Sequence, residues 1–311
     1  MRTMNKETYA QLRKSLAFLR KIAINKWSWS NELQLPPLLE RLEFDLLDFY
    51  DSLTTLRLSK KDKERIDKAL IYFCYLHKDQ LRKRGNQPYF AHILRVATKV
   101  ADMLTEVQNT GANKTKDHVA DIIISALAHD SVEDHAISIA GGALMSKDVV
   151  SIRDRALKVV ENKFGESVRH WVSVLSKPEW EEPRNKKREY SQWVQDIWQD
   201  GDWVSTILKL SDIFDNLEST INEMESFSLE ANSSSRNVYK KMQSLLKKYT
   251  AILLDFAENY DEYASGTPLS QRGIKNYINK SFKELLSRAV SLPGLLDTEY
   301  QKIKKLIGQA L

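Results

Sequence analysis

The chain has 311 residues, of which 42% are hydrophobic and 29% are charged, whereas glycine and proline number only 10 and 7. This length and composition suit a helix-rich globular protein with a substantial core, and they exclude a disordered or fibrous chain. The formal net charge of +5 favours anionic partners, but only weakly because it is spread over the whole chain.

Cysteine content and hydropathy narrow the setting in which the protein is expected to work. A single cysteine, Cys74, excludes an internal disulfide framework and a metal site made of cysteines alone, so we expect a reducing, cytoplasmic environment. No uninterrupted apolar run approaches the ~18 residues of a membrane span. Basic residues interrupt the apolar positions near the N-terminus, which favours a packed first helix over a signal peptide, with binding to a membrane surface as the alternative.

Helical periodicity dominates the pattern of apolar residues, and alternating strand-like patterns are short and rare. Two or three helices are predicted in the first 60 residues, with a break at Pro36 and Pro37. Residues 135–147 are small and include glycines, so we expect a loop there, and the charged stretch Lys177–Arg188 is expected to form a surface excursion. Later helices are predicted at about 117–130, 148–163, 166–176, 188–199 and 202–227.

These elements predict an all-α fold in three parts. Residues 1–60 form an N-terminal helical extension, residues 61–227 form the central domain, and residues 228–311 form a C-terminal helical segment. The stretch Glu230–Arg236 is linker-like in composition, and two or three helices are expected after it. No internal repeat of fixed period is found.

Imidazole and carboxylate groups stand out within this helical pattern because their surroundings are apolar. His129 and Asp130 end the apolar run IIISALA, where a buried carboxylate would need a partner. Asp212 interrupts an otherwise apolar helix face, and Asn216 lies one turn further along the same face. His92 lies on another predicted helix. Two imidazoles and two carboxylates would form a mixed nitrogen and oxygen ligand set for Mn²⁺, Fe²⁺, Zn²⁺ or Mg²⁺.

Such an ion would lower the pKa of a bound water and neutralise charge on phosphate oxygens, which favours hydrolysis of phosphate esters. Each residue alone has a plainer explanation. His92 could be an ordinary packed histidine, and Asp212 could pair with Lys209 on its own helix. Glu133 and Asp134 could form a solvated loop or a helix cap. The order of the motifs along the chain argues against coincidence.

Four stretches carry this order: HKDQLRKRGNQPYFAHILRVA (His77–Ala97), SALAHDSVEDH (Ser125–His135), KFGESVRHWVSVLSKP (Lys163–Pro178) and ILKLSDIFDNL (Ile207–Leu217). Together they resemble the HD hydrolase domain of the RelA/SpoT-type alarmone enzymes. The resemblance covers roughly half of the chain, from about Lys61 to Glu225. It implies an orthogonal all-α bundle, with the terminal helices as additions, that removes the 3′-pyrophosphate from ppGpp or pppGpp.

The resemblance also implies a role for each matching residue. One Mn²⁺-type ion would be held by His92, His129, Asp130 and Asp212. Glu133 and Asp134 would act on the attacking water or on the proton of the leaving group. The nucleotide would be contacted by Arg82, Lys83 and Asn216. Independently of the family, the basic turn at Arg82–Arg84 suits a pyrophosphate, and Lys177 could either reach a phosphate or remain a surface lysine.

Some positions depart from the family pattern. Ile93 stands where the family usually has proline, Asp215 stands where it often has histidine, and the segment between Asp134 and Phe164 is longer than usual. No synthetase motif is found, so we expect a hydrolase-only enzyme of the stringent response. The alternatives are an HD phosphohydrolase for another nucleotide and a catalytically inactive nucleotide sensor. The expected partner is a small nucleotide rather than nucleic acid or membrane. The sequence does not fix the oligomeric state, and an oligomer is possible.

Overall fold

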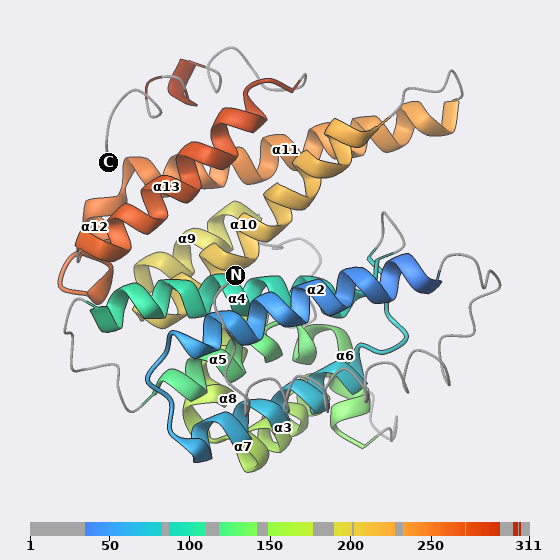
Figure 1. Cartoon of the computed structure of the whole chain (residues 1–311), viewed down its shortest axis with the longest axis vertical. Coiled ribbons are helices and arrows are strands. Elements are labelled where there is room, and N and C mark those ends of the chain that lie inside the picture. Colours follow the sequence, from blue (N-terminus) through green and yellow to red (C-terminus); the bar gives the residue numbers. More distant parts are fainter. Residues whose placement is uncertain are drawn as a thin grey trace. The chain divides into compact units, whose positions relative to one another are not determined.

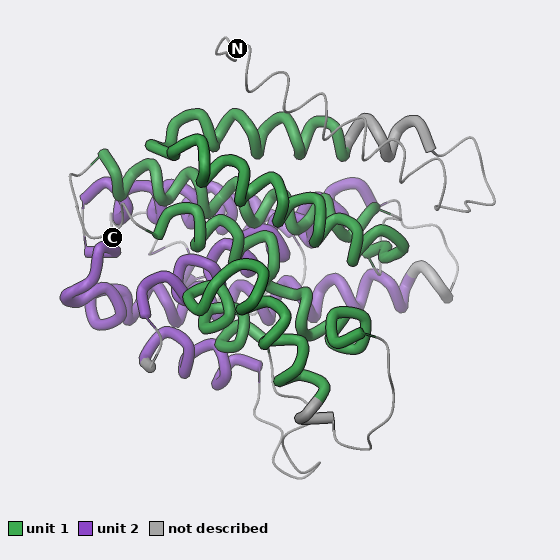
Figure 2. Tube along the Cα trace, turned by 90° about the horizontal axis from the view of Figure 1, so that it is seen from below, with its two compact units in different colours: residues 1–188 green, residues 189–311 purple. Residues whose placement is uncertain are grey.

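The computed structural model describes residues 35–82, 87–109, 118–141, 149–176, 190–200, 202–227, 233–270, 272–292, 301–303 and 305. In these ranges the protein is all-α, as the sequence predicts, and extended pairing is limited to an isolated bridge between Leu81 and Pro88 (Figure 1). Among the described helices, none has the length and apolarity needed to cross a membrane. The chain divides into two compact units, residues 1–188 and 189–311 (Figure 2).

The first unit is built around helices α4 and α5. Helix α2 packs along α4, helices α3 and α8 pack on α5, and α6 packs against α7 and α3. Figure 1 shows α2 and α4 running side by side. The bounds are α2 Leu35–Thr54, α3 Lys60–Leu76, α4 Tyr89–Asn109, α5 Val119–Ala128, α6 Ser131–Ile139, α7 Val149–Phe164 and α8 Glu166–Leu175.

Helix α5 is a core helix because it is apolar on every side. All of its residues except Asp121 are buried, and Asp121 forms an ion pair with Arg65 of α3 at 2.5 Å. A helix without a polar face is stable only when neighbours cover it all round, and α3, α4 and α8 provide that cover. The end of α5 therefore delivers His129 into the interior of the unit, with Asp130 half-buried beside it.

Helix α3 begins with a capping box and ends at His77. The Ser59 hydroxyl accepts a hydrogen bond from the backbone N–H of Asp62 at 3.1 Å, and the Asp62 carboxylate accepts one from the backbone N–H of Ser59 at 3.2 Å. This reciprocal pair fixes the first turn of the helix. Ile66, Leu70 and Phe73 bury the inner face of α3, and His77 follows as its C-cap.

The second unit is organised around helix α10, which packs against α9, α11 and α13. The Asp202 carboxylate caps α10 by accepting a hydrogen bond from the backbone N–H of Ser205 at 2.8 Å. The bounds are α9 Tyr190–Asp200, α10 Trp203–Ser226, α11 Ser233–Glu258, α12 Tyr260–Ala264, the 3-10 helix η4 Pro268–Ser270 and α13 Arg272–Ala289.

The helices predicted in the central part of the chain are observed as α5, α7, α8, α9 and α10, with ends within a few residues of the expected ones. Two loop predictions are wrong in part. Helix α6 continues through residues 135–139, with a kink at His135, because Val132 and Ile139 are buried and no glycine or proline occurs before Gly141. Helix α11 already begins at Ser233, inside the stretch that is linker-like in composition.

Other sequence predictions concern residues outside the described ranges or are not tested by the fold. The expected packed first helix in residues 1–27 and the surface excursion at 177–188 lie outside those ranges. The three-part division of the chain stays a prediction. Helix α10, which that division joins to α4 and α5, is grouped with the second unit.

The capping box of α3 gives a first test of the fold. Replacing Ser59 by alanine is expected to lower the free energy of unfolding by ~1 kcal/mol, because a backbone N–H of the first turn loses its acceptor. Urea denaturation of the full chain, followed by circular dichroism, measures the change. Ser138→Ala, at an exposed position of α6, is the control and should stay within ~0.5 kcal/mol of wild type. Equal losses in the two variants would contradict the capping role.

Candidate metal centre

Three of the four predicted metal ligands come together in the first unit. His92 comes from the first turn of α4, and His129 and Asp130 form the turn between α5 and α6. Their candidate ligand atoms all lie within 4.8 Å of one another. The Oδ2 atom of Asp130 lies 3.0 Å from Nε2 of His129 and 3.7 Å from Nε2 of His92. Both imidazoles are buried, with exposed fractions of 3% and 1%.

The protonation of His129 is constrained by its backbone partner. Its Nδ1 lies 2.8 Å from the carbonyl oxygen of Ala126, and a carbonyl can only accept, so Nδ1 carries a hydrogen. Nε2 of the neutral ring then presents a lone pair toward Asp130. A metal-binding histidine is commonly held in this way, with its other ring nitrogen donating to a carbonyl.

The contact between His129 and Asp130 requires a positive charge. A carboxylate oxygen and an imidazole lone pair repel each other at 3.0 Å unless a proton or a metal ion lies between them. Burial alone would raise the pKa of Asp130, but the adjacent His129 and His92 imidazoles outweigh it and hold that pKa well below its usual range. An ionised oxygen facing two imidazole nitrogens fits a divalent ion such as Mn²⁺, Fe²⁺ or Zn²⁺.

Tyr89 supports this cluster and was not singled out by the sequence. Its hydroxyl donates a hydrogen bond to Oδ2 of Asp130 at 2.5 Å. Its ring lies edge-on to His92, with 5.5 Å between ring centroids. Tyr89 and His92 occupy positions i and i+3 of α4, so they share a helix face, and this spacing is the signal that could have identified Tyr89.

Asp212, the fourth predicted ligand, lies on α10 in the second unit. It is 5% exposed, and its Oδ2 accepts from Nζ of Lys209 at 2.8 Å. Its Oδ1 accepts from Nδ2 of Asn216 at 2.6 Å. This ion pair with Lys209 is the plainer explanation that the sequence offers for a carboxylate on an apolar helix face. Convergence of Asp212 with the three ligands of the first unit stays a prediction.

The predicted catalytic carboxylates, Glu133 and Asp134, lie in the first turn of α6, directly after Asp130. Oδ2 of Asp134 accepts from Nε2 of Gln80 at 2.6 Å. Partial burial, together with the charge of Asp130, raises the pKa of Asp134 above its ordinary value even though Gln80 stabilises the ionised form. A carboxyl group with a raised pKa is better suited to exchange protons near neutral pH.

The predicted phosphate-binding residues are described only in part. The backbone N–H of Arg82 donates to the carbonyl of Gln87 at 2.9 Å, next to the bridge between Leu81 and Pro88. This pairing closes the basic turn at its base. Lys83 and Lys177 lie outside the described residues. Asn216 is held against Asp212 in the second unit.

The supporting role of Tyr89 can be tested by removing its hydroxyl. Tyr89→Phe is expected to weaken Mn²⁺ binding by ~10-fold or more, because loss of an outer hydrogen bond leaves a ligating carboxylate less well oriented. Isothermal titration of the metal-stripped chain measures the affinity. Tyr72→Phe, on α3 with its ring against Phe73 and Phe164, is the matched control. An unchanged affinity in Tyr89→Phe would remove Tyr89 from the centre.

Comparison with known proteins adds no relative of this chain. No protein-family model matches it, and no curated protein or solved structure matches it either. The identification of the centre therefore depends on the observed geometry of His92, His129 and Asp130 and on the order of the sequence motifs.

Proposed function

We propose that the protein is a metal-dependent phosphohydrolase that removes the 3′-pyrophosphate from ppGpp-like nucleotides. The observation that carries the proposal is the meeting of one carboxylate with two buried imidazoles, those of Asp130, His92 and His129. The motif order that resembles the RelA/SpoT-type HD domain supplies the substrate class.

In this proposal His92, His129 and Asp130 hold the ion, and Asp212 is the fourth ligand. When bound, a divalent ion lowers the pKa of water and offsets negative charge on phosphate oxygens. The chain itself keeps Asp130 ionised, and Tyr89 orients that carboxylate.

The roles of the remaining residues follow from their charge and position. Glu133 and Asp134 follow Asp130 closely in the chain and are proposed to move protons to and from the reacting oxygens, which requires a pKa not far from the working pH. Arg82, Lys83 and Lys177 are proposed to bind the phosphate oxygens, because guanidinium and ammonium groups form strong charge-assisted hydrogen bonds with them. Asn216 is proposed to help hold the nucleotide.

A product assay tests the function directly. The purified chain with Mn²⁺ is expected to release pyrophosphate from ppGpp, and a chelator is expected to stop the reaction. His129→Ala should lower the turnover by at least ~100-fold, because a ligand is lost. His118→Ala, whose side chain is 54% exposed, is the matched control and should keep wild-type turnover. Orthophosphate release from another nucleotide would favour the wider HD phosphohydrolase class. Tight ppGpp binding with no turnover under any divalent ion would favour a sensor.

The role of Asp212 needs a test that separates a metal ligand from a structural ion pair. Asp212→Asn leaves Lys209 buried without its carboxylate, so it should destabilise the protein by ~3–5 kcal/mol whichever role is correct. Adding Lys209→Gln removes the second charge and should restore much of that stability. If Asp212 is a ligand, the double variant remains deficient in Mn²⁺ and in turnover. Wild-type Mn²⁺ content in the stable double variant would limit Asp212 to the ion pair.

A further inference from the structure

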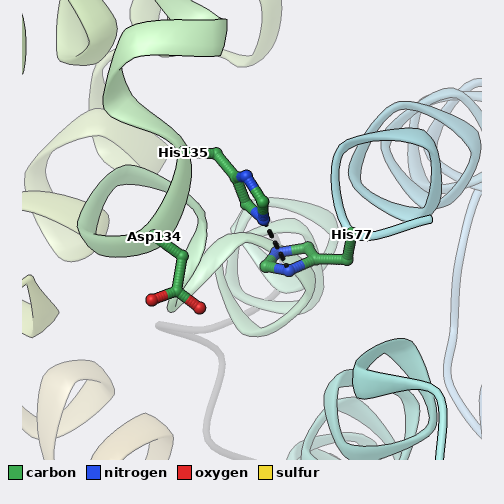
Figure 3. A group of neighbouring side chains, drawn as sticks. All are labelled: His77, Asp134 and His135. Carbon is green, nitrogen blue, oxygen red and sulfur yellow. Dashed lines mark hydrogen bonds between the residues drawn. The ribbon is translucent and has the colours of Figure 1, made fainter. Parts of the chain in front are cut away.

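A second group of potential ligands lies in the first unit, outside the centre described above. His77 ends α3, Gln80 follows in the next turn, and Asp134 and His135 lie on α6. Figure 3 shows the rings of His77 and His135 meeting, with Asp134 beside them. One ligand atom from each of His77, Asp134 and His135 lies within 4.8 Å of the others. We call these four residues the His77 cluster.

We propose that the His77 cluster is a second binding site for a divalent transition-metal ion, distinct from the centre at His92, His129 and Asp130. Nδ1 of His77 and Nε2 of His135 are 3.1 Å apart, and Oε1 of Gln80 lies 2.5 Å and 3.1 Å from them. Metal–nitrogen bonds of ~2.0–2.1 Å place neighbouring ligand atoms ~3.0–3.4 Å apart in tetrahedral or octahedral sites. The spacing of the two ring nitrogens matches that range.

The polar contacts of the cluster turn two ring nitrogens and an amide oxygen toward one point. The amide of Gln80 is oriented by Asp134, because Nε2 of Gln80 donates to that carboxylate and Oε1 then faces both rings. Without an ion, one ring nitrogen donates a hydrogen toward Oε1 of Gln80, and the other can accept in the hydrogen bond between the two rings at 3.1 Å. An ion bound by the two nitrogen lone pairs and the amide oxygen would take the place of this hydrogen bonding.

The surroundings of the two rings suit metal ligands. His77 is 1% exposed, its Nε2 lies 3.4 Å from Oγ of Ser131, and its ring stacks on Tyr89 with 5.3 Å between centroids. Such outer contacts fix the orientation of a ligating imidazole. His135 has non-helical backbone angles within α6, φ −130° and ψ 21°, at the point where its ring meets His77. Burial lowers the pKa of both His77 and His135 below the ordinary imidazole value.

The donor set identifies the class of ion. Two imidazoles, one carboxylate and one amide oxygen suit Zn²⁺ and the neighbouring first-row ions better than Ca²⁺, which prefers oxygen ligands alone.

Tyr89 contacts both sites, since its ring stacks on His77 and its hydroxyl donates to Asp130. The second site stands on this geometry and does not depend on the proposed reaction. With Asp134 engaged by an ion, proton transfer in that reaction would fall to Glu133.

Zinc stoichiometry tests the second site without any nucleotide. The full chain is stripped with a chelator, dialysed against Zn²⁺, and analysed for metal by mass spectrometry. His77→Ala and His135→Gln are each expected to bind one Zn²⁺ per chain fewer than wild type, with the affinity of that ion reduced by at least ~100-fold. His129→Ala should lose a different ion, so its combination with His135→Gln should lose both. His170→Ala, at an exposed position of α8, is the matched control.

The variants separate the possible outcomes. His135 is only half-buried, so His135→Gln keeps the test valid if His77→Ala fails to fold by circular dichroism. One Zn²⁺ that is lost in His135→Gln and kept in His129→Ala would support the second site while contradicting the first. Zinc binding that is equal in His135→Gln, His170→Ala and wild type would overturn the second site and leave the His77 cluster as a hydrogen-bonded network.

Discussion

The carboxylate of Asp130 lies at the end of an apolar helix and faces two buried imidazoles, and its side chain is 21% exposed, so water stabilises its negative charge only in part. A buried charge is tolerated only when an opposite charge or several hydrogen-bond donors compensate it. Tyr89 supplies one donor, and His92 and His129 point their nitrogen atoms at the same oxygen. A cation, either a proton or a metal ion, is needed between the carboxylate oxygen and the imidazole nitrogens. The centre depends on the attraction between this cation and those three groups.

The fold explains why these groups meet. Helix α5 is buried on nearly all sides, so its C-terminal residues must enter the interior, and α4 passes beside it with His92 in its first turn. Helix α6 starts directly after Asp130 and packs against α3, which brings His135 to His77. Tyr89 then contacts both groups of ligands. A change in the position of α6 relative to α3 and α4 would therefore alter both sites together.

Local features of the fold and site could be predicted from the sequence, whereas contacts made by tertiary packing could not. Apolar periodicity located most helices, and the i, i+3 spacing of Lys209 and Asp212 indicated their ion pair. His92 was joined to His129 and Asp130 through the order of the motifs. The meeting of His77 with His135 depends on the packing of α3 against α6 across 58 residues of sequence, and no local pattern encodes it. The second half of the short helix α6 was predicted as a loop because residues 135–147 are small and include glycines.

The ion pair between Lys209 and Asp212 sets a condition on the proposed role of Asp212 as the fourth metal ligand. Asp212 can bind an ion only if the ion competes successfully with the Lys209 ammonium, which is itself buried. That ammonium has another partner, because it lies 4.5 Å from the ring centroid of Trp193 and 5.3 Å from that of Tyr190. Cation–π attraction of roughly 2 kcal/mol at desolvated sites would lower the cost of releasing the carboxylate. The aromatic rings of α9 thus make Asp212 easier to recruit than an isolated buried ion pair would be.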